Sequence, residues 1–171
     1  MLFEIKSFQD RIAHLYPKVM DLSLGRIKNL LKKLGNPQDS IERIIHVAGT
    51  NGKGSTLTYI SSILSASGYS VDSYTSPHLV HFNERIKIGR KGYQEDINDA
   101  ALEEILLQCE QVNDGDPITI FELITAAAFL KFSKTKSDFL ILETGLGGRL
   151  DATNVIQNPL VSVITPIGID H

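Results

Sequence analysis

A glycine-rich run at residues 49–55, Gly-Thr-Asn-Gly-Lys-Gly-Ser, combines the residue types that hold a triphosphate. It lies between a predicted strand and a predicted helix, so backbone N–H groups and the helix N-terminus can point at phosphate oxygens. Lys53 would neutralise the β- and γ-phosphates, and the hydroxyl of Ser55 would join the Mg²⁺ shell. The run therefore predicts a site for ATP and Mg²⁺, formed by Thr50, Asn51, Gly52, Lys53, Gly54 and Ser55.

The run departs from the common phosphate-loop pattern in two places. A glycine stands between Lys53 and Ser55, and the first glycine, Gly49, is nearer to the end of the run than in that pattern. A glycine-rich turn with an exposed lysine is the alternative. The order of strand, loop, lysine, serine and helix favours the phosphate loop.

A second chemically loaded segment, residues 143–154, begins with an acid directly after a predicted strand. Glu143 would project at the carboxyl edge of the sheet, where Mg²⁺ and ATP are expected, so we predict it to be a metal ligand. A strand that ends in an acid is sometimes only a helix cap, and this alternative stays open. The glycines that follow let the backbone approach a ligand, and we expect Arg149 and Asp151 to contact the substrate.

Alternating strands and helices must position these segments. The hydrophobic spacing predicts helices over residues 4–20, from Ser23 as N-cap to Gly35, 55–67, 97–112 and 119–132. Short apolar or β-branched runs predict strands over residues 43–48, 71–74, 85–88, 138–143 and 160–165. This alternation indicates an α/β fold with a mostly parallel sheet flanked by helices, in which ligands bind beyond the carboxyl ends of the strands.

The composition excludes several classes of function. The 171 residues are enough for one domain with a core, and a net charge of −3 argues against nucleic-acid binding. The single cysteine, Cys109, excludes an intramolecular disulfide and a cysteine-based zinc site. No signal peptide and no apolar run of about 20 residues is present, so we expect a cytoplasmic protein without a membrane partner.

The motifs occur in an order that resembles a known family. The run 49–55 is similar to the ATP loop of the Mur ligase superfamily, and the 48 residues before it resemble the layout of its folate branch. Further segments resemble motifs of bifunctional dihydrofolate synthase/folylpolyglutamate synthase: Ser-Pro-His at 76–78, Asn-Glu-Arg-Ile at 83–86, Phe-Glu at 121–122, the segment 143–154 and Ile-Gly-Ile-Asp-His at 167–171.

This resemblance implies roles that spacing alone leaves open. Ser76 would be a metal ligand, although Ser-Pro by itself is a turn signal, and His171 would bind a second metal ion. Phe121 and Glu122 would line a pterin pocket together with Arg149 and Asp151. From spacing alone, Phe121 is equally a core residue and Glu122 a first-turn acid that matches the helix dipole.

The resemblance also implies an activity. The family joins L-glutamate to dihydropteroate or to folates through an acyl phosphate made with ATP and Mg²⁺, here with Lys53, Glu143 and His171 as catalytic residues. The expected organisation is a helical segment at 1–42 and an incomplete, Mur-ligase-like P-loop domain at 43–171, without the C-terminal glutamate-ligase domain. The full-length enzyme is expected to be a monomer and the isolated chain inactive. The alternatives are a non-catalytic nucleotide-binding fragment and another P-loop phosphotransferase.

Overall fold

A six-stranded sheet forms the centre of the computed structural model, which describes Phe8, Arg11, Leu15 and residues 23–168. The strand order in this part of the chain is β4-β3-β2-β5-β1-β6. The strands are β1 (Ile44–Ala48), β2 (Val71–Tyr74), β3 (Ile86–Arg90), β4 (Tyr93–Asp96), β5 (Phe139–Glu143) and β6 (Val161–Ile164). Strands β2, β5, β1 and β6 pair in parallel, whereas β3 pairs antiparallel with both of its neighbours, β2 and β4. The predicted α/β fold with a mostly parallel sheet is confirmed.

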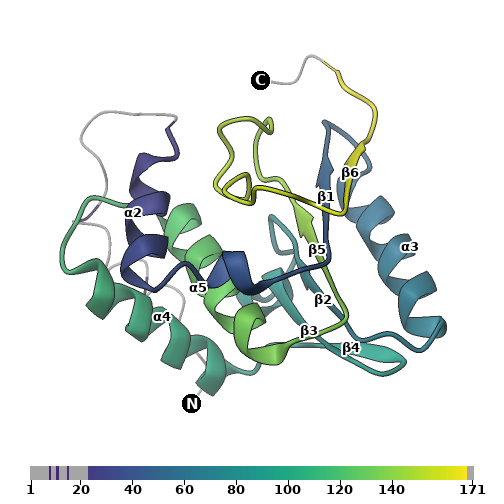
Figure 1. Ribbon diagram of the computed structural model, residues 1–171, viewed down its shortest axis with the longest axis horizontal. Coiled ribbons are helices and arrows are strands. Elements are labelled where there is room, and N and C mark those ends of the chain that lie inside the picture. Colours follow the sequence, from purple (N-terminus) through teal and green to yellow (C-terminus); the bar gives the residue numbers. More distant parts are fainter. Residues whose placement is uncertain (1–7, 9–10, 12–14, 16–22, 169–171) are drawn as a thin grey trace.

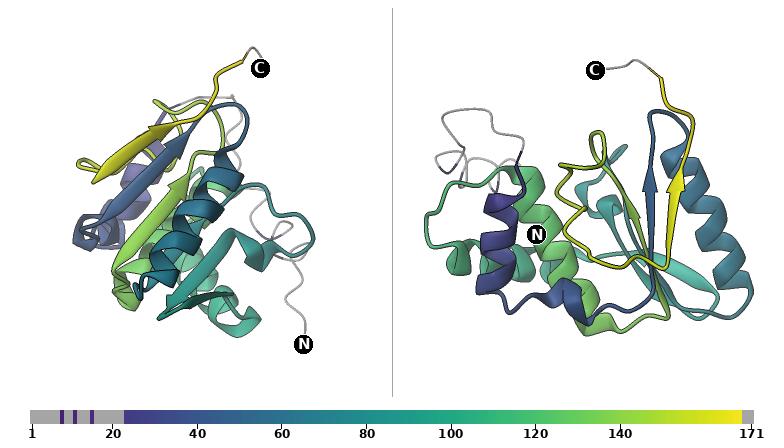
Figure 2. Two further views of the ribbon diagram at one scale, coloured as in Figure 1. Left: turned by 90° about the vertical axis from the view of Figure 1, so that its right-hand side faces the viewer. Right: turned by 45° about the horizontal axis from the view of Figure 1, so that its top comes forward.

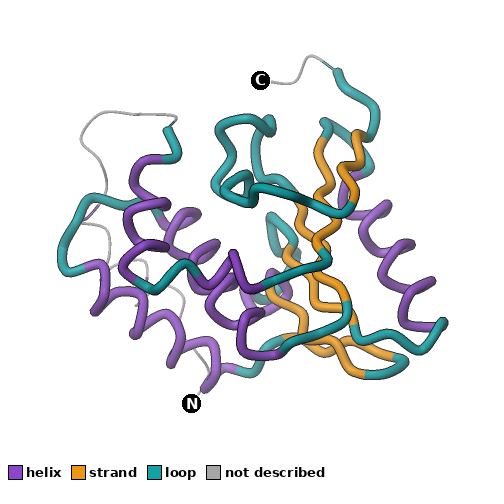
Figure 3. Tube along the Cα trace, viewed as in Figure 1, coloured by secondary structure: helices purple, strands orange, loops and turns teal. Residues whose placement is uncertain are grey.

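Helices cover both faces of this sheet (Figures 1 and 3). They are α2 (Gly25–Lys33), α3 (Lys53–Ala66), α4 (Asp99–Asn113) and α5 (Ile120–Thr135), with short 3₁₀ helices at Pro37–Ser40 and Phe82–Arg85. Of the helices that the structure describes, α3 covers one face, and α5 covers the other with α2 and α4 packed against it. Because α5 is a middle layer, most of its surface is buried, which explains its lack of a polar face.

Alternation along the central strands divides the core in two. Ile45, Val47 and Ile141 pack toward α3, whereas Ile44 and Leu140 belong to the larger cluster around α5. A β-strand sends successive side chains to opposite faces, so this pattern follows directly from the sequence. Glu143 shares its parity with Ile141, and this places the carboxylate on the α3 side of the sheet.

Two predictions about the elements need correction, and one strand was not predicted. The N-cap of α2 is Leu24, which makes no side-chain capping bond, and not Ser23. Residues 160–165, predicted as a buried strand, form the edge strand β6, in which Val161 and Ile164 are exposed because no further strand or helix covers them in the described chain. Strand β4 was not predicted because its polar sequence, Tyr-Gln-Glu-Asp, has no apolar alternation.

Other elements match with small shifts of their ends. Helix α3 begins two residues before the predicted start, because Gly52 with a φ of 83° ends the loop there. The helix predicted at 4–20 lies outside the described residues, apart from Phe8, Arg11 and Leu15. Among the helices that the structure describes, none is both long and apolar enough to cross a membrane.

Gly89 permits close contact between β3 and β2 and gives a stability test. A β-carbon on Gly89 would collide with the backbone of Val71, which cannot move aside as a side chain can. Gly89→Ala is expected to destabilise the protein by about 1–3 kcal/mol, as overpacking does, measured by urea unfolding. The matched control is Gly25→Ala in α2, where the β-carbon meets only Ser23 Oγ at 3.7 Å. Equal stability of the two variants would contradict this packing argument.

Candidate nucleotide and metal site

The phosphate loop joins the carboxyl end of β1 to the N-terminus of α3 (Figure 1). Its backbone requires glycine at Gly49, with a φ of 136°, and at Gly52, with a φ of 83°. Gly52 is the N-cap of α3 and supplies no side-chain capping bond, and the first turn of the helix has no acidic residue. The first N–H groups of α3 are therefore not occupied by a side-chain cap, which is the arrangement that binds phosphate.

Lys53 folds back over this loop. Its Nζ donates to the carbonyl oxygen of Gly49 at 2.9 Å and to that of Thr50 at 3.3 Å. The ammonium group thus lies on the loop that would surround phosphate oxygens. Ser55 is exposed in the first turn of α3 and so is accessible to a bound ion.

The segment after β6 braces the phosphate loop from the other side. The N–H groups of Thr50 and Asn51 donate to the carbonyl oxygen of Pro166 at 3.1 and 3.5 Å. The Thr50 hydroxyl donates to the carbonyl oxygen of Gly168 at 3.2 Å and accepts from its N–H at 3.0 Å. Sequence reasoning missed this contribution of residues 165–168, because no local pattern indicates which strand will lie beside β1.

Glu143 lies at the end of β5, next to the phosphate loop, with a relative exposure of 7%. A β-carbon placed on Gly54 would be 3.7 Å from its Oε2, so the carboxylate reaches the first turn of α3. Burial raises the pKa of Glu143, while the N–H of Ser76 and the charge of Lys53 oppose the rise. The site thus holds a partly buried carboxylate whose charged form needs a positive partner.

Ser76 contacts this carboxylate through its backbone. Its N–H donates to Oε2 of Glu143 at 3.4 Å, and its Oγ is buried without a hydrogen-bond partner. A buried hydroxyl that lacks a partner beside a carboxylate suits a hard divalent cation, which prefers oxygen ligands. No group of three His, Cys, Asp or Glu residues occurs in the described part of the chain, so hydroxyl and phosphate oxygens would complete the shell.

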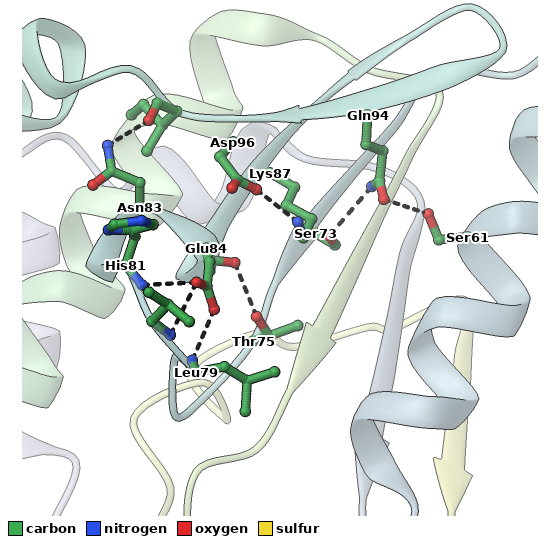
Figure 4. A network of polar contacts seen from close by, with 12 residues as sticks. Ser61, Ser73, Thr75, Leu79, His81, Asn83, Glu84, Lys87, Gln94 and Asp96 are labelled. Carbon is green, nitrogen blue, oxygen red and sulfur yellow. Dashed lines mark hydrogen bonds and ion pairs between the residues drawn. The ribbon is translucent and has the colours of Figure 1, made fainter.

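Glu84 holds residues 79–81, which follow shortly after Ser76, through backbone hydrogen bonds (Figure 4 shows Glu84 with Leu79 and His81). Its carboxylate accepts the N–H groups of Leu79 at 2.7 Å, Val80 at 3.0 Å and His81 at 2.7 Å. These backbone hydrogen bonds, that of His81 foremost, lower the pKa of Glu84 to about 2. The carbonyl oxygen of Glu84 also accepts from the Thr75 hydroxyl at 3.1 Å. The sequence marked this acid within a motif but did not indicate its role as the organiser of residues 79–81.

Phe121 and Glu122 begin α5. A β-carbon on Gly145 would collide with the ring of Phe121, so the ring lies against the loop after β5. Glu122 makes a capping box with Thr119, whose N–H and hydroxyl both donate to its Oε2 at 2.9 Å. It also accepts from Nε of Arg26 at 3.0 and 3.1 Å. The structure thus shows the capping role that the sequence left open, and the pterin contacts of Phe121 and Glu122 stay a prediction.

Asp151 lies inside the loop after β5 and not on its surface. Its Oδ2 accepts the N–H groups of Gly145 at 2.8 Å and Leu146 at 2.9 Å, and its Oδ1 accepts the N–H and the hydroxyl of Thr153. These four donors fill the about four acceptor positions of a carboxylate. Arg149 is exposed in the same loop. The predicted substrate contacts of Arg149 and Asp151 therefore stay predictions, and the observed bonds of Asp151 organise the loop.

His171, predicted as a metal ligand, lies outside the described residues. The phosphate loop, Ser76 and Glu143 lie at the carboxyl ends of β1, β2 and β5, neighbouring strands whose ends face the same edge of the sheet (Figure 2). Phe121 and Glu122 instead begin α5, and Arg149 and Asp151 lie in the loop after β5. The described arrangement brings together the uncapped N-terminus of α3, the ammonium group of Lys53 and the side-chain oxygens of Glu143 and Ser76.

The chain is similar to several folate ligases over most of its length. It is 48% identical over 152 residues to a dihydrofolate synthase/folylpolyglutamate synthase of Bacillus subtilis, covering 86% of this chain and 35% of that protein. The structure matches Escherichia coli FolC in complex with DHPP and ADP with a TM-score of 0.87 and 37% identity, covering 98% of this chain and 39% of FolC.

A further solved structure shows the same relationship. A bifunctional folylpolyglutamate synthase/dihydrofolate synthase with Mn, AMPPNP and L-glutamate bound matches with a TM-score of 0.85 and 36% identity, over 98% of this chain and 39% of that one. No protein-family model matches the chain. The chain spans about a third of the length of the curated relatives it matches.

Glu143→Gln is expected to stabilise the ligand-free protein at neutral pH, because it removes a buried charge. Burial raises the pKa of this carboxyl, so the stability it contributes is present below its unfolded-state pKa and is lost as the pH rises through its folded-state pKa. The midpoint of thermal unfolding should exceed that of wild type by about 2 °C or more at neutral pH. The difference should vanish below about pH 4, where the carboxyl is protonated in both states.

The control for this comparison is Glu104→Gln, at an exposed position of α4. It should leave the unfolding midpoint unchanged at both pH values. A Glu143→Gln variant that is less stable than wild type at neutral pH would show that the carboxylate is a favourable structural charge.

Proposed function

We propose that this chain, which is homologous to the N-terminal part of dihydrofolate synthase/folylpolyglutamate synthases, provides the ATP, metal and acceptor sites of a ligase that adds L-glutamate to dihydropteroate or folates. One observation carries the proposal. The uncapped N-terminus of α3, the buried carboxylate of Glu143 and the unpaired hydroxyl of Ser76 meet at one edge of the sheet. This is the arrangement that binds a nucleotide phosphate together with a divalent cation.

The residues of the phosphate loop bind and position ATP. Residues 50–55 surround the phosphates, with the N–H groups of Gly52 to Ser55 as donors, and the ammonium group of Lys53 neutralises the phosphate charge. Ser55, Ser76 and Glu143 would hold one metal ion and His171 a second, and a bound metal would supply Lewis-acid stabilisation of phosphoryl oxygens. The relative solved with Mn and AMPPNP supports a divalent metal at such a site, and Mg²⁺ is the proposed physiological ion.

The reaction proceeds in two transfers. A carboxylate oxygen of the acceptor attacks the γ-phosphorus of ATP, and ADP leaves, so that an acyl phosphate forms. The amino nitrogen of L-glutamate then attacks the acyl carbon, phosphate leaves and the nitrogen loses a proton to give the amide. Positioning and charge neutralisation supply most of the rate in such phosphoryl transfers. Lys53 and the phosphate loop carry out this positioning on the ATP side.

The acceptor binds on the other side of the site. Phe121 stacks on the flat heterocycle, Glu122 and Arg149 provide polar contacts around it, and Asp151 acts by holding the loop beside it. The complex of FolC with DHPP and ADP, which matches over 98% of this chain, supports an acceptor site within this region. The division of the chain near residue 42, the cytoplasmic location and a monomeric enzyme belong to the same proposal.

Two further candidates, a nucleotide-binding module without turnover and another P-loop phosphotransferase, are distinguished from the ligase by experiment. A nucleotide-binding module would bind ATP without any release of ADP. A P-loop phosphotransferase would instead release ADP in the presence of its acceptor without any amino acid. The requirement for L-glutamate therefore distinguishes the ligase from that alternative.

Lys53→Ala is expected to weaken binding of AMPPNP with Mn²⁺ by about tenfold or more, because a charge-assisted contact to phosphate is lost. Calorimetry on the chain measures this affinity. Lys91→Ala, in the turn between β3 and β4, is the matched control and should bind as wild type does.

Turnover is tested in a chimera in which this chain replaces the matching residues of the Bacillus subtilis relative. The chimera should release ADP over many turnovers only with dihydropteroate and glutamate together; sustained ADP release with dihydropteroate but without glutamate would refute the ligase.

Ser76→Ala tests the metal site separately from the phosphate loop. Because the Ser76 hydroxyl is buried without a partner, its removal should leave the free energy of unfolding unchanged or slightly higher. The affinity for Mn²⁺ in the presence of AMPPNP should fall by about tenfold, as for other losses at metal sites. Unchanged Mn²⁺ affinity together with lost stability would indicate a purely structural serine.

A further inference from the structure

A buried series of hydrogen bonds from His46 through Thr153 to Asp151, which we call the His46 chain, connects β1 to the loop after β5. Nε2 of His46 lies 2.8 Å from Oγ1 of Thr153, and this hydroxyl lies 2.6 Å from Oδ1 of Asp151. Their relative exposures are 8%, 0% and 5%, so water cannot substitute for these partners. His46 shares its parity along β1 with Ile44, which places it on the α5 side of the sheet, opposite to Glu143.

The hydrogen bonds define the proton positions in the His46 chain. The Thr153 hydroxyl has one proton, and Asp151, when ionised, accepts only, so the hydroxyl donates to Asp151. The same oxygen must then accept from His46, which requires a proton on Nε2 of the imidazole. Burial lowers the pKa of His46 against the opposing charge of Asp151, consistent with the neutral Nε2–H form. The chain therefore runs in one direction, from the imidazole through the hydroxyl to the carboxylate.

Asp151, the last member of the His46 chain, holds the glycine loop, which we define as residues 145–148. Oδ2 of Asp151 accepts the N–H groups of Gly145 and Leu146, and the N–H of Asp151 donates to the carbonyl oxygen of Gly148 at 3.0 Å. Gly145 lies against the ring of Phe121. Asp151 thus controls the backbone that contacts the proposed acceptor-binding ring.

The phosphate loop depends on other contacts. Its N–H groups bond to Pro166, and Thr50 bonds to Gly168, without a member of the His46 chain. A substitution in the His46 chain should therefore displace the glycine loop and leave the nucleotide site in place. This separation makes the two sides of the site independently testable.

We propose that His46 and Thr153 are positioning residues for the acceptor: through Asp151 they hold the glycine loop against Phe121. The inference rests on the proposed ligase function, because it assigns the Phe121 side of the site to dihydropteroate. Neither residue contacts the acceptor itself. Their effect is transmitted by the two N–H groups that Asp151 accepts.

Thr153→Val removes the hydroxyl and keeps the shape of the side chain. We expect amide hydrogen exchange at Gly145 and Leu146, followed by NMR, to accelerate by about tenfold or more, and the affinity for dihydropteroate to fall by about tenfold. Binding of AMPPNP with Mn²⁺ should stay within about twofold of wild type, since distant sites are nearly independent. Thr153→Ser retains the hydroxyl and should restore slow exchange and both affinities.

The control is Thr135→Val, which removes another hydrogen bond between a threonine and an aspartate, in this case a partly buried one. Thr135 Oγ1 donates to Asp72, which lies among residues 40–43 and 136–140 at the opposite end of the sheet. This variant should lose stability without faster exchange at Gly145 and Leu146. Similar exchange in the two valine variants, or equal loss of both ligands in Thr153→Val, would overturn the positioning role.

The outcomes also separate this inference from the proposed function. If wild type binds dihydropteroate and Thr153→Val binds it equally well, the positioning role fails and the ligase proposal stands. If exchange accelerates in Thr153→Val but wild type binds neither dihydropteroate nor AMPPNP, the ligase proposal fails and with it the acceptor role of the His46 chain. If wild type binds AMPPNP but not dihydropteroate, only the assignment of the acceptor side is overturned.

Discussion

The carboxylate of Glu143 is buried beside the N-terminus of α3, and the rest of the site is arranged around this charge. Its position at the end of β5 brings it to Ser76 on one side and to Gly54 on the other. A buried charge is unfavourable unless it has partners, so this carboxylate suits a state in which a cation and phosphate groups are bound. The cost of burying the carboxylate in the free protein is thus linked to the affinity of the site.

Around this carboxylate, backbone loops are held by hydrogen bonds to polar groups. Glu84 accepts the N–H groups of residues 79–81, and Asp151 accepts those of residues 145 and 146. The carbonyl oxygen of Pro166 accepts those of the phosphate loop. Each acceptor satisfies N–H groups that would otherwise need water, and each leaves the outer surface of its loop accessible. Such loops are preorganised for ligands, because their shapes do not depend on the ligand being present.

Helix α5 gives these loops a common support. It lies between the sheet and the pair α2 and α4, so its apolar composition reflects its position as a middle layer. At its N-terminus, Glu122 is shared between the capping box and Arg26 of α2, and this joins the helical layer to the end of the sheet that carries the site. The ring of Phe121 on the same turn lies against the glycine loop, so the acceptor side inherits the rigidity of α5.

Local patterns in the sequence determined the fold class, five of the six strands in the described chain and the convergence of residues 49–55, Ser76 and Glu143 at one edge of the sheet. These features depend on side-chain periodicity and on the rule that parallel strands end at the same edge. Only the tertiary structure decided the partners of Glu84, Asp151 and His46, the bracing of the phosphate loop by Pro166 and the exposure of β6. The physical reason is that hydrogen bonds between distant segments and the place of a strand in a sheet depend on strand order and loop paths, which no local spacing encodes.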